Sequence, residues 1–148
     1  MSARSSRESI VIGVGGVVWN NRGEVLLVRR ANPPRQHEWS LPGGKVEFGE
    51  TLHSALAREV QEETGLAIQI VGLVEVAELI EEAHYVLIDF TARSFSGDPH
   101  AGSDASEARW FAIREIPRLA LWSETVRVIE LSANMLNAPQ PSHISQSG

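Results

Sequence analysis

The residues best suited to chemistry are three glutamates near the end of one segment. Glu59, Glu62 and Glu63 fall within residues 52–64, whose apolar spacing predicts an amphipathic helix. Because a helix turns about 100° per residue, positions i, i+3 and i+4 share a face, so the three carboxylates point the same way. They continue roughly along the apolar stripe of Leu52, Ala55, Leu56 and Val60. A merely solvated charged face would lie on the opposite side.

This acidic cluster is unfavourable in an isolated helix. Like charges at i,i+4 repel by a few tenths of a kcal/mol, and acids near a helix C-terminus oppose the macrodipole by a similar amount. A bound cation would reverse both effects, and hard ions such as Mg²⁺ take carboxylate oxygens as ligands. A surface helix rich in glutamate is the alternative interpretation. Arg58 inside the cluster, the turn Pro42-Gly43-Gly44 before the helix and Gly65 after it favour the metal site.

Composition limits the classes of function. The 148 residues suit one domain, and the formal net charge of −6 argues against a protein that coats a nucleic-acid polymer. Small anionic substrates remain compatible, because a metal ion can lie between acids. The absence of cysteine excludes disulfides, zinc–thiolate sites and thiol nucleophiles. No segment approaches the roughly 20 apolar residues that cross a bilayer, so we expect a cytoplasmic protein with no membrane partner.

The order of elements predicts one α/β or α+β domain with a mixed sheet between helices. Residues 1–9 are expected to be flexible, residues 10–136 to form the domain, and residues 137–148 to be disordered. Strands are expected at residues 10–19, 24–30, 37–41, 45–48, 67–79, 84–94 and 107–113. The first of these strands is apolar throughout, which indicates burial on both faces. A loop is expected at residues 95–106 and a second helix at 119–136, with Val126, Ile129 and Leu131 or Ala133 facing inward.

The segment around the glutamates resembles the Nudix box. Gly44, five residues, Glu50, seven residues and then Arg58-Glu59-Val60-Gln61-Glu62-Glu63-Thr64-Gly65-Leu66 match that motif over residues 44–66. Residues 39–44, Trp-Ser-Leu-Pro-Gly-Gly, also resemble the approach to the box in small pyrophosphohydrolases of the MutT-like and ADP-ribose pyrophosphatase-like kinds. The resemblance implies an α/β/α sandwich with a mixed central sheet.

The same resemblance implies roles for individual residues. A divalent metal, usually Mg²⁺ with Mn²⁺ able to replace it, would be bound by Gly43, Glu59, Glu62 and Glu63. Arg58 and Glu50 would form a supporting pair that orients the helix. The implied reaction is hydrolysis of the diphosphate linkage in a nucleoside diphosphate derivative, such as a nucleoside triphosphate, ADP-ribose or a nucleotide sugar.

The sequence offers several candidates for the general base and for the residues that contact the substrate. Glu59 or Glu63 could remove the proton from the attacking water, as could Asp104 or Glu107 on the loop before Trp110. The candidates for substrate contacts are two arginines at a strand end, a glycine at the box and an aromatic residue that could stack on a base: Arg29, Arg30, Gly44 and Tyr85. Trp19, Phe48 and Trp122 are further aromatic candidates, although each such residue is more often part of the core.

Three classes of function are compared. A metal-dependent pyrophosphohydrolase is favoured, with a small nucleotide as partner and, from the family, a homodimer as assembly. A non-catalytic nucleotide sensor on the same fold is the alternative. An isopentenyl diphosphate isomerase is disfavoured because that activity looks for a catalytic cysteine. Residues 79–83, Leu-Ile-Glu-Glu-Ala, lack the marker proline of some ADP-ribose-cleaving members, which weakens an ADP-ribose assignment.

Overall fold

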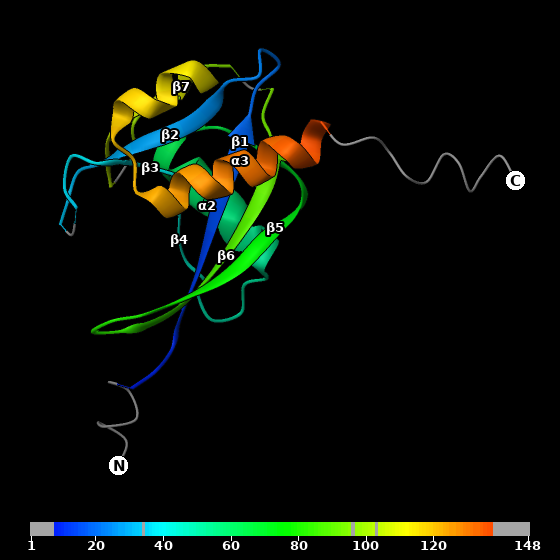
Figure 1. The fold of residues 1–148 in the computed structure, drawn as a ribbon. Helices are drawn as coiled ribbons and strands as arrows, with labels where there is room; N and C mark the ends of the chain where they lie inside the picture. Colours follow the sequence, from blue (N-terminus) through cyan, green and yellow to red (C-terminus); the bar gives the residue numbers. More distant parts are fainter. Residues whose placement is uncertain (1–7, 34, 96, 103, 138–148) are drawn as a thin grey trace, which may run out of the picture.

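The computed structural model describes residues 8–33, 35–95, 97–102 and 104–137. Its elements follow in the order β1 (Val11–Trp19), β2 (Val25–Arg30), β3 (Trp39–Ser40), β4 (Gly43–Lys45), α2 (Leu52–Thr64), β5 (Gln69–Ile80), β6 (His84–Arg93), β7 (Ala105–Phe111), the 3₁₀ helix η1 (Ile113–Leu119) and α3 (Ser123–Asn137). Figure 1 shows these elements along the chain. None of the helices in the described ranges is long and apolar enough to cross a membrane.

The strands form one mixed sheet. Its order is β3-β2-β1-β6-β5, and β4 also pairs with β1 while β7 also pairs with β2. The β1–β6 pair is parallel and the other pairs are antiparallel. Strands β1 and β2 meet only at Trp19 and Val25, so the sheet divides between them, and β3 and β4 lie on either side of the division.

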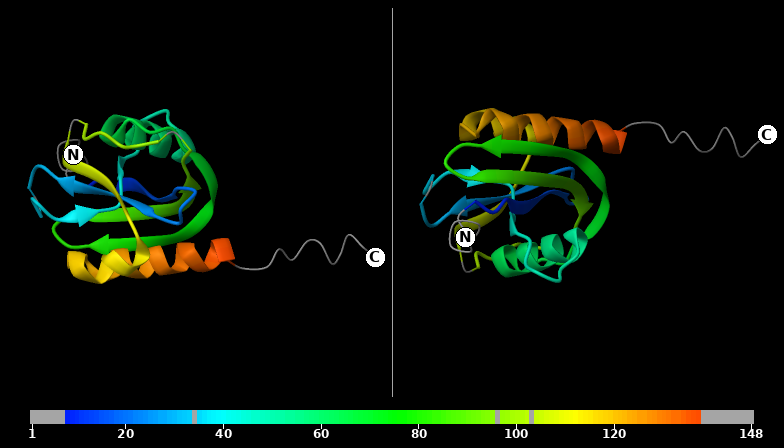
Figure 2. Two further views of the ribbon diagram at one scale, coloured as in Figure 1. Left: turned by 90° about the horizontal axis from the view of Figure 1, so that it is seen from above. Right: turned by 90° about the horizontal axis from the view of Figure 1, so that it is seen from below.

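The two long helices cover opposite faces of this sheet, as Figure 2 shows. Each face has its own apolar cluster. On the α2 side, Leu56 and Val60 pack with Val18, and on the α3 side, Ile129 packs with Val17. The predicted α/β/α sandwich with a mixed sheet is therefore confirmed.

Strand β1 separates the two clusters, as its apolar sequence predicts. Val17 and Val18 are both fully buried and point to opposite faces. Its glycines lie where other groups approach closely: a Cβ on Gly16 would fall 3.2 Å from Leu56, and one on Gly15 would fall 2.5 Å from the Asp89 carboxyl group. The glycines thus serve close packing within a strand, the meaning expected for glycine in that position.

Two strand boundaries near the box differ from the prediction. The strand expected at residues 45–48 is β4, which begins at Gly43 and ends at Lys45, and the one expected at 37–41 contains only Trp39 and Ser40. The two glycines suggested a turn, but a Cβ on Gly43 would lie 2.1 Å from the Val14 carbonyl oxygen. Glycine is therefore required here by the approach of β1. Strand β7 likewise starts at Ala105, two residues earlier than predicted, and ends at Phe111.

The C-terminal helix predicted at residues 119–136 is present as α3, but it begins four residues later than predicted. Residues 113–119 form the 3₁₀ helix, Ala120 adopts a left-handed conformation with φ 52°, and α3 begins only at Ser123. Pro117 lies inside the 3₁₀ segment and cannot donate a backbone hydrogen bond. In α3, Ile129 is buried and Val126 and Ala133 pack against the core, whereas Leu131 is exposed.

Most residues at the two ends of the chain, for which flexibility and disorder are predicted, are not described by the structure. Residues 1–7 and 138–148 lie outside the described ranges, so flexibility there stays a prediction. Asn137, assigned to the tail by sequence, is the last residue of α3.

Candidate active site

Helix α2 carries the acidic cluster and has the bounds that the sequence predicts. Thr51 is its N-cap: the Thr51 hydroxyl accepts a hydrogen bond from the Ser54 N–H, and the Ser54 hydroxyl accepts one from the Thr51 N–H, both at 3.0 Å. Gly65 ends the helix in a left-handed conformation with φ 75°. These caps fix which residues occupy the last turn, and so fix the direction of the glutamates.

Arg58 is the centre of the charge network on α2. Its Nε and Nη2 donate to the two oxygens of Glu50 at 2.6 and 2.9 Å, a bidentate pair. Its Nη2 also donates to the Lys45 carbonyl at 3.1 Å, while Nη1 donates to Glu59 at 2.8 Å and to Glu62 at 3.0 Å. The pairing lowers the pKa of Glu50 to about 2. Arg58 thereby links the loop before the helix to two acids of the cluster.

Glu63 is the most strongly perturbed acid. Burial raises its pKa to about 7, and the charges of Glu59 and Asp104 act in the same direction. The Gly43 N–H donates to Glu63 Oε1 at 2.8 Å, which opposes the rise. Burial also raises the pKa of Glu59, against the attraction of Arg58. Glu59 and Glu63 therefore lie in a region of low solvation, where neighbouring carboxyl groups add to the unfavourable charge.

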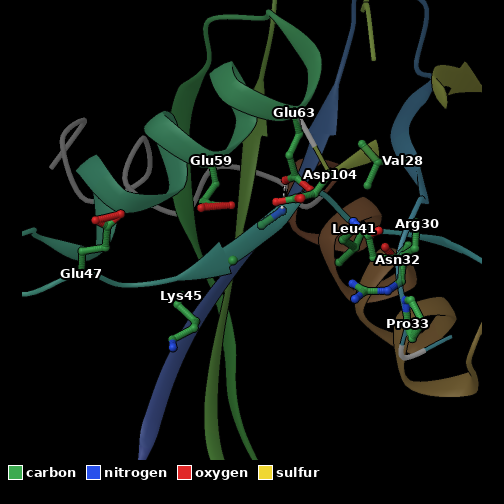
Figure 3. A pocket seen from close by; sticks show the side chains of 13 residues that line it. Val28, Arg30, Asn32, Pro33, Leu41, Lys45, Glu47, Glu59, Glu63 and Asp104 are labelled. Atoms are coloured by element: carbon green, nitrogen blue, oxygen red, sulfur yellow. Dashed lines mark hydrogen bonds between the residues drawn. The ribbon is translucent and has the colours of Figure 1, made fainter. Parts of the chain in front are cut away.

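A cavity of about 580 Å³ opens beside these acids. Figure 3 shows Glu59 and Glu63 projecting from α2, Asp104 next to Glu63, and Arg30 across the cavity from them. Its wall also includes Val28, Ser40, Leu41, Gly43 and Gly44. The cavity thus has acids on one side and a guanidinium on the other, a suitable arrangement for an anion bound through a cation.

The pairing of β2 with β7 brings Arg30 and Asp104 together. Arg30 pairs in register with Ala105, and the Ala31 N–H donates to the Asp104 carbonyl at 3.2 Å. Arg29 points elsewhere: its Nη1 donates to Glu107 at 3.1 Å. Of the two arginines and two loop acids proposed from sequence, the cavity is lined by Arg30 and Asp104.

Four of the remaining predicted site residues are not among the described residues that line the cavity: Glu50, Arg58, Glu62 and Tyr85. Glu50 and Arg58 support the helix, and Glu62 has a half-exposed side chain paired with Arg58. Tyr85 lies at the start of β6, beside Val11 and Leu79.

Sequence reasoning missed several lining residues, namely Asn32, Pro33, Ser40, Lys45 and Glu47. Lys45 follows the two glycines directly, and its positive charge could have indicated a residue close to a phosphate of the substrate. Nothing in the local sequence marked the segment of Asn32 and Pro33, because the sheet brings it to the site.

The residues present fit a divalent metal. A Cβ on Gly44 would lie 2.2 Å from Glu59 Oε2, so the chain keeps an open space next to that oxygen. Buried carboxylates with raised pKa values gain from a neighbouring cation, and oxygen donors suit Mg²⁺ or Mn²⁺. Within the described residues no group of three or more acids or histidines is already gathered as a metal cage. Glu59 and Glu62 instead bond to Arg58, and Glu63 to Gly43.

A family model described as NUDIX domain matches residues 10–131. The chain belongs to the Nudix family. The resemblance to the Nudix family, based on residues 44–66, is thereby confirmed. Nudix hydrolases act on phosphorus-containing acid anhydrides of small nucleotides and generally need a divalent metal, and this chain is one of them.

Curated relatives and solved structures agree with the family. The Nudix chain is 35% identical over 118 residues to the ADP-ribose pyrophosphatase of Methanocaldococcus jannaschii. The aligned region covers 78% of this chain and 69% of that protein. It is 31% identical over 131 residues to the 8-oxo-dGDP phosphatase NUDT18 of Mus musculus, covering 86% of this chain but only 40% of that protein. The crystal structure of a MutT NUDIX hydrolase from Burkholderia pseudomallei matches with a TM-score of 0.73 and 31% identity, over 84% of this chain and 98% of that one.

Proposed function

We propose that this chain is a Mg²⁺-dependent pyrophosphohydrolase that cleaves the diphosphate linkage of a nucleoside diphosphate derivative. The observation that carries the proposal is that Glu59, Glu63 and Asp104 line one cavity together, with Arg30 across from them. The names of two relatives, an ADP-ribose pyrophosphatase and an 8-oxo-dGDP phosphatase, refer to substrates that share a nucleoside diphosphate group. That shared group is what this arrangement of charges suits.

In this proposal the residues divide the work. Glu59 and Glu63, with Glu62 and the Gly43 carbonyl, would hold the metal, which when bound neutralises charge on the phosphates. Arg30 binds a phosphate oxygen from the other wall of the cavity. Arg58, held by Glu50, keeps the end of α2 in position.

Proton transfer is assigned to Asp104. Its carboxylate lines the cavity next to Glu63, and we propose that it accepts the proton of the attacking water. Glu107 is the weaker candidate because it is paired with Arg29. Attack by water at a diphosphate phosphorus breaks the anhydride bond, and the departing phosphate leaves with Arg30 as a neighbouring cation.

The test is a substrate screen with purified protein, with Mg²⁺, with Mn²⁺ and with EDTA. The panel contains ADP-ribose, nucleotide sugars, dinucleoside polyphosphates and ordinary and oxidised nucleoside triphosphates, and the products are separated by chromatography. We expect at least one substrate to be hydrolysed efficiently with metal, and the double variant Glu59→Gln, Glu63→Gln to lose at least 100-fold in kcat/KM. A panel that is bound tightly but not hydrolysed would overturn the proposal and favour a nucleotide sensor.

A further inference from the structure

The segment between β6 and β7 is bound to the end of α2 that carries the acids. The His100 N–H donates to the Thr64 carbonyl and the Gly102 N–H donates to the Glu63 carbonyl, both at 2.8 Å. Glu63 and Thr64 are the last two residues of the helix, so their carbonyls have no acceptor role within it. The segment therefore supplies donors that the end of the helix lacks, and it does so at the turn that contains Glu63.

Gly102 lies at the closest approach between this segment and the helix. A Cβ on Gly102 would lie 1.7 Å from the Glu62 carbonyl oxygen and 3.2 Å from the Glu63 carbonyl carbon. Both atoms belong to the backbone of α2, so a side chain could enter only if the segment moved away from the helix. Gly102 does not have the left-handed conformation of Gly97, so its backbone would accept alanine if there were room. Lack of space, and not backbone conformation, requires a glycine here.

The same segment brings Asp104 to the cavity, two residues after Gly102. The Ala105 N–H donates to the Gly102 carbonyl and the Ala31 N–H donates to the Asp104 carbonyl, both at 3.2 Å. The backbone around Asp104 is thus held by α2 on one side and by the end of β2 on the other. Figure 3 shows the result, with the Asp104 carboxyl group next to Glu63.

We propose that Gly102 is a positioning residue that sets the place of the Asp104 carboxyl group relative to the acids of α2. The proposal rests on the proposed hydrolysis, in which Asp104 accepts the proton of the attacking water. Gly102 is not among the described residues that line the cavity, and it acts through Asp104. Its hydrogen bond to the Glu63 carbonyl ties the base to the neighbouring acid through the main chain. A displacement of about 1 Å at such a distance from the chemistry can cost on the order of 100-fold in rate.

Steady-state kinetics of Gly102→Ala, with the best substrate of the screen, test this role. We expect kcat to fall at least tenfold and KM to change less than threefold, because Arg30 is held in the sheet on the other wall. The control is Gly72→Ala, the same exchange on β5, where the added Cβ would lie at an ordinary 3.5 Å from the Met135 side chain. It should leave kcat within twofold of the wild type. Wild-type kcat in Gly102→Ala would overturn the positioning role and leave the hydrolysis proposal standing.

A double variant shows whether Gly102 acts through Asp104. In Gly102→Ala, Asp104→Asn, kcat should stay within threefold of Asp104→Asn alone, because the displaced group is no longer a base. Losses that multiply would show that Gly102 acts through another group, and would overturn the proposal.

Metal affinity separates the base from the metal-binding acids. Calorimetric titration with Mn²⁺, without substrate, should give Gly102→Ala an affinity within threefold of the wild type, because Glu59, Glu62 and Glu63 keep their places on α2. A loss of Mn²⁺ affinity as large as the loss of kcat would mean that Gly102 supports the metal-binding acids, and would overturn the proposed action through Asp104.

A measurement on the wild type covers the case in which the variant does not fold. In amide hydrogen exchange followed by NMR, the His100 and Gly102 N–H groups should exchange at least tenfold more slowly than that of Ala101, an exposed residue between them. Exchange at Gly102 as fast as at Ala101 would overturn the contact with α2. This measurement needs no substrate, so a failed substrate screen and a failed contact are distinguishable.

Discussion

Replacing Glu63 by glutamine should stabilise the metal-free protein while abolishing most of its activity. Glu63 is partly buried beside Glu59 and Asp104, and its pKa is raised to about 7. Glutamine has the same shape, and its side-chain carbonyl can still accept the hydrogen bond from Gly43. The substitution therefore removes a charge without removing the contact that holds the side chain.

The magnitude follows from the pKa. A rise from 4.5 to about 7 corresponds to roughly 3 kcal/mol at about 1.4 kcal/mol per unit, and partial access to solvent makes this the upper end. Because the folded-state pKa of Glu63 exceeds the unfolded value, the folded protein binds the extra proton between pH 4.5 and 7. The contribution of this group to stability is therefore lost as pH rises through that window. Glutamine does not titrate, so the variant does not lose this stability. The free energy of unfolding of the variant should therefore exceed that of the wild type by near zero at pH 4.5 and by roughly 1–3 kcal/mol at pH 8.

Urea unfolding in EDTA at several pH values between 4.5 and 8 measures this difference. Glu130→Gln, an exposed exchange on α3, is the control and should stay within about 0.5 kcal/mol of the wild type. Adding Mg²⁺ at pH 8 should stabilise the wild type more than the Glu63 variant, and kcat/KM of the variant should fall at least 100-fold. A variant that is no more stable than the wild type in EDTA at pH 8 would refute the reasoning that the acids are crowded there.

Three further predictions concern the support of the site and the base. Arg58→Lys should lower kcat/KM at least tenfold in steady-state assays, because lysine cannot make the bidentate pair with Glu50; full activity would contradict a positioning role. Asp104→Asn should lower kcat more than tenfold and Glu107→Gln less than threefold, and the reverse order would reassign the base. Thr51→Ala should cost about 1 kcal/mol in urea unfolding through loss of the N-cap, with kcat/KM changed less than threefold by the substitution; no loss of stability would contradict the cap.

The acidic helix could be predicted from sequence because its determinants are local. A hydroxyl residue at Thr51, apolar spacing after it and Gly65 at its end are enough to fix residues 52–64. The direction of the glutamates follows from those bounds. Strand β1 was predictable for a similar reason, since its apolar run reports burial on both faces.

The opposite wall of the cavity could not be predicted in the same way. Arg30 and Asp104 meet because β2 pairs with β7, at a register that shifts between Arg29 and Arg30. A register between strands so far apart in sequence is set by packing, and an irregularity of one residue exchanges the faces of the side chains. Sequence alone therefore left two arginines and two acids as equal candidates, and the pairing separates them.

Arg58 explains how the site tolerates its acids before metal binds. Two of its donors, Nε and Nη2, hold Glu50 and the Lys45 carbonyl, while Nη1 alone is shared by Glu59 and Glu62. A cation that takes over Glu59 and Glu62 thus needs to replace contacts from a single nitrogen. The bonds that fix the helix against the loop before it remain in place during that exchange. One guanidinium can therefore offset part of the charge of Glu59 and Glu62 while its other donors position the helix, a combination that the single point charge of lysine does not provide.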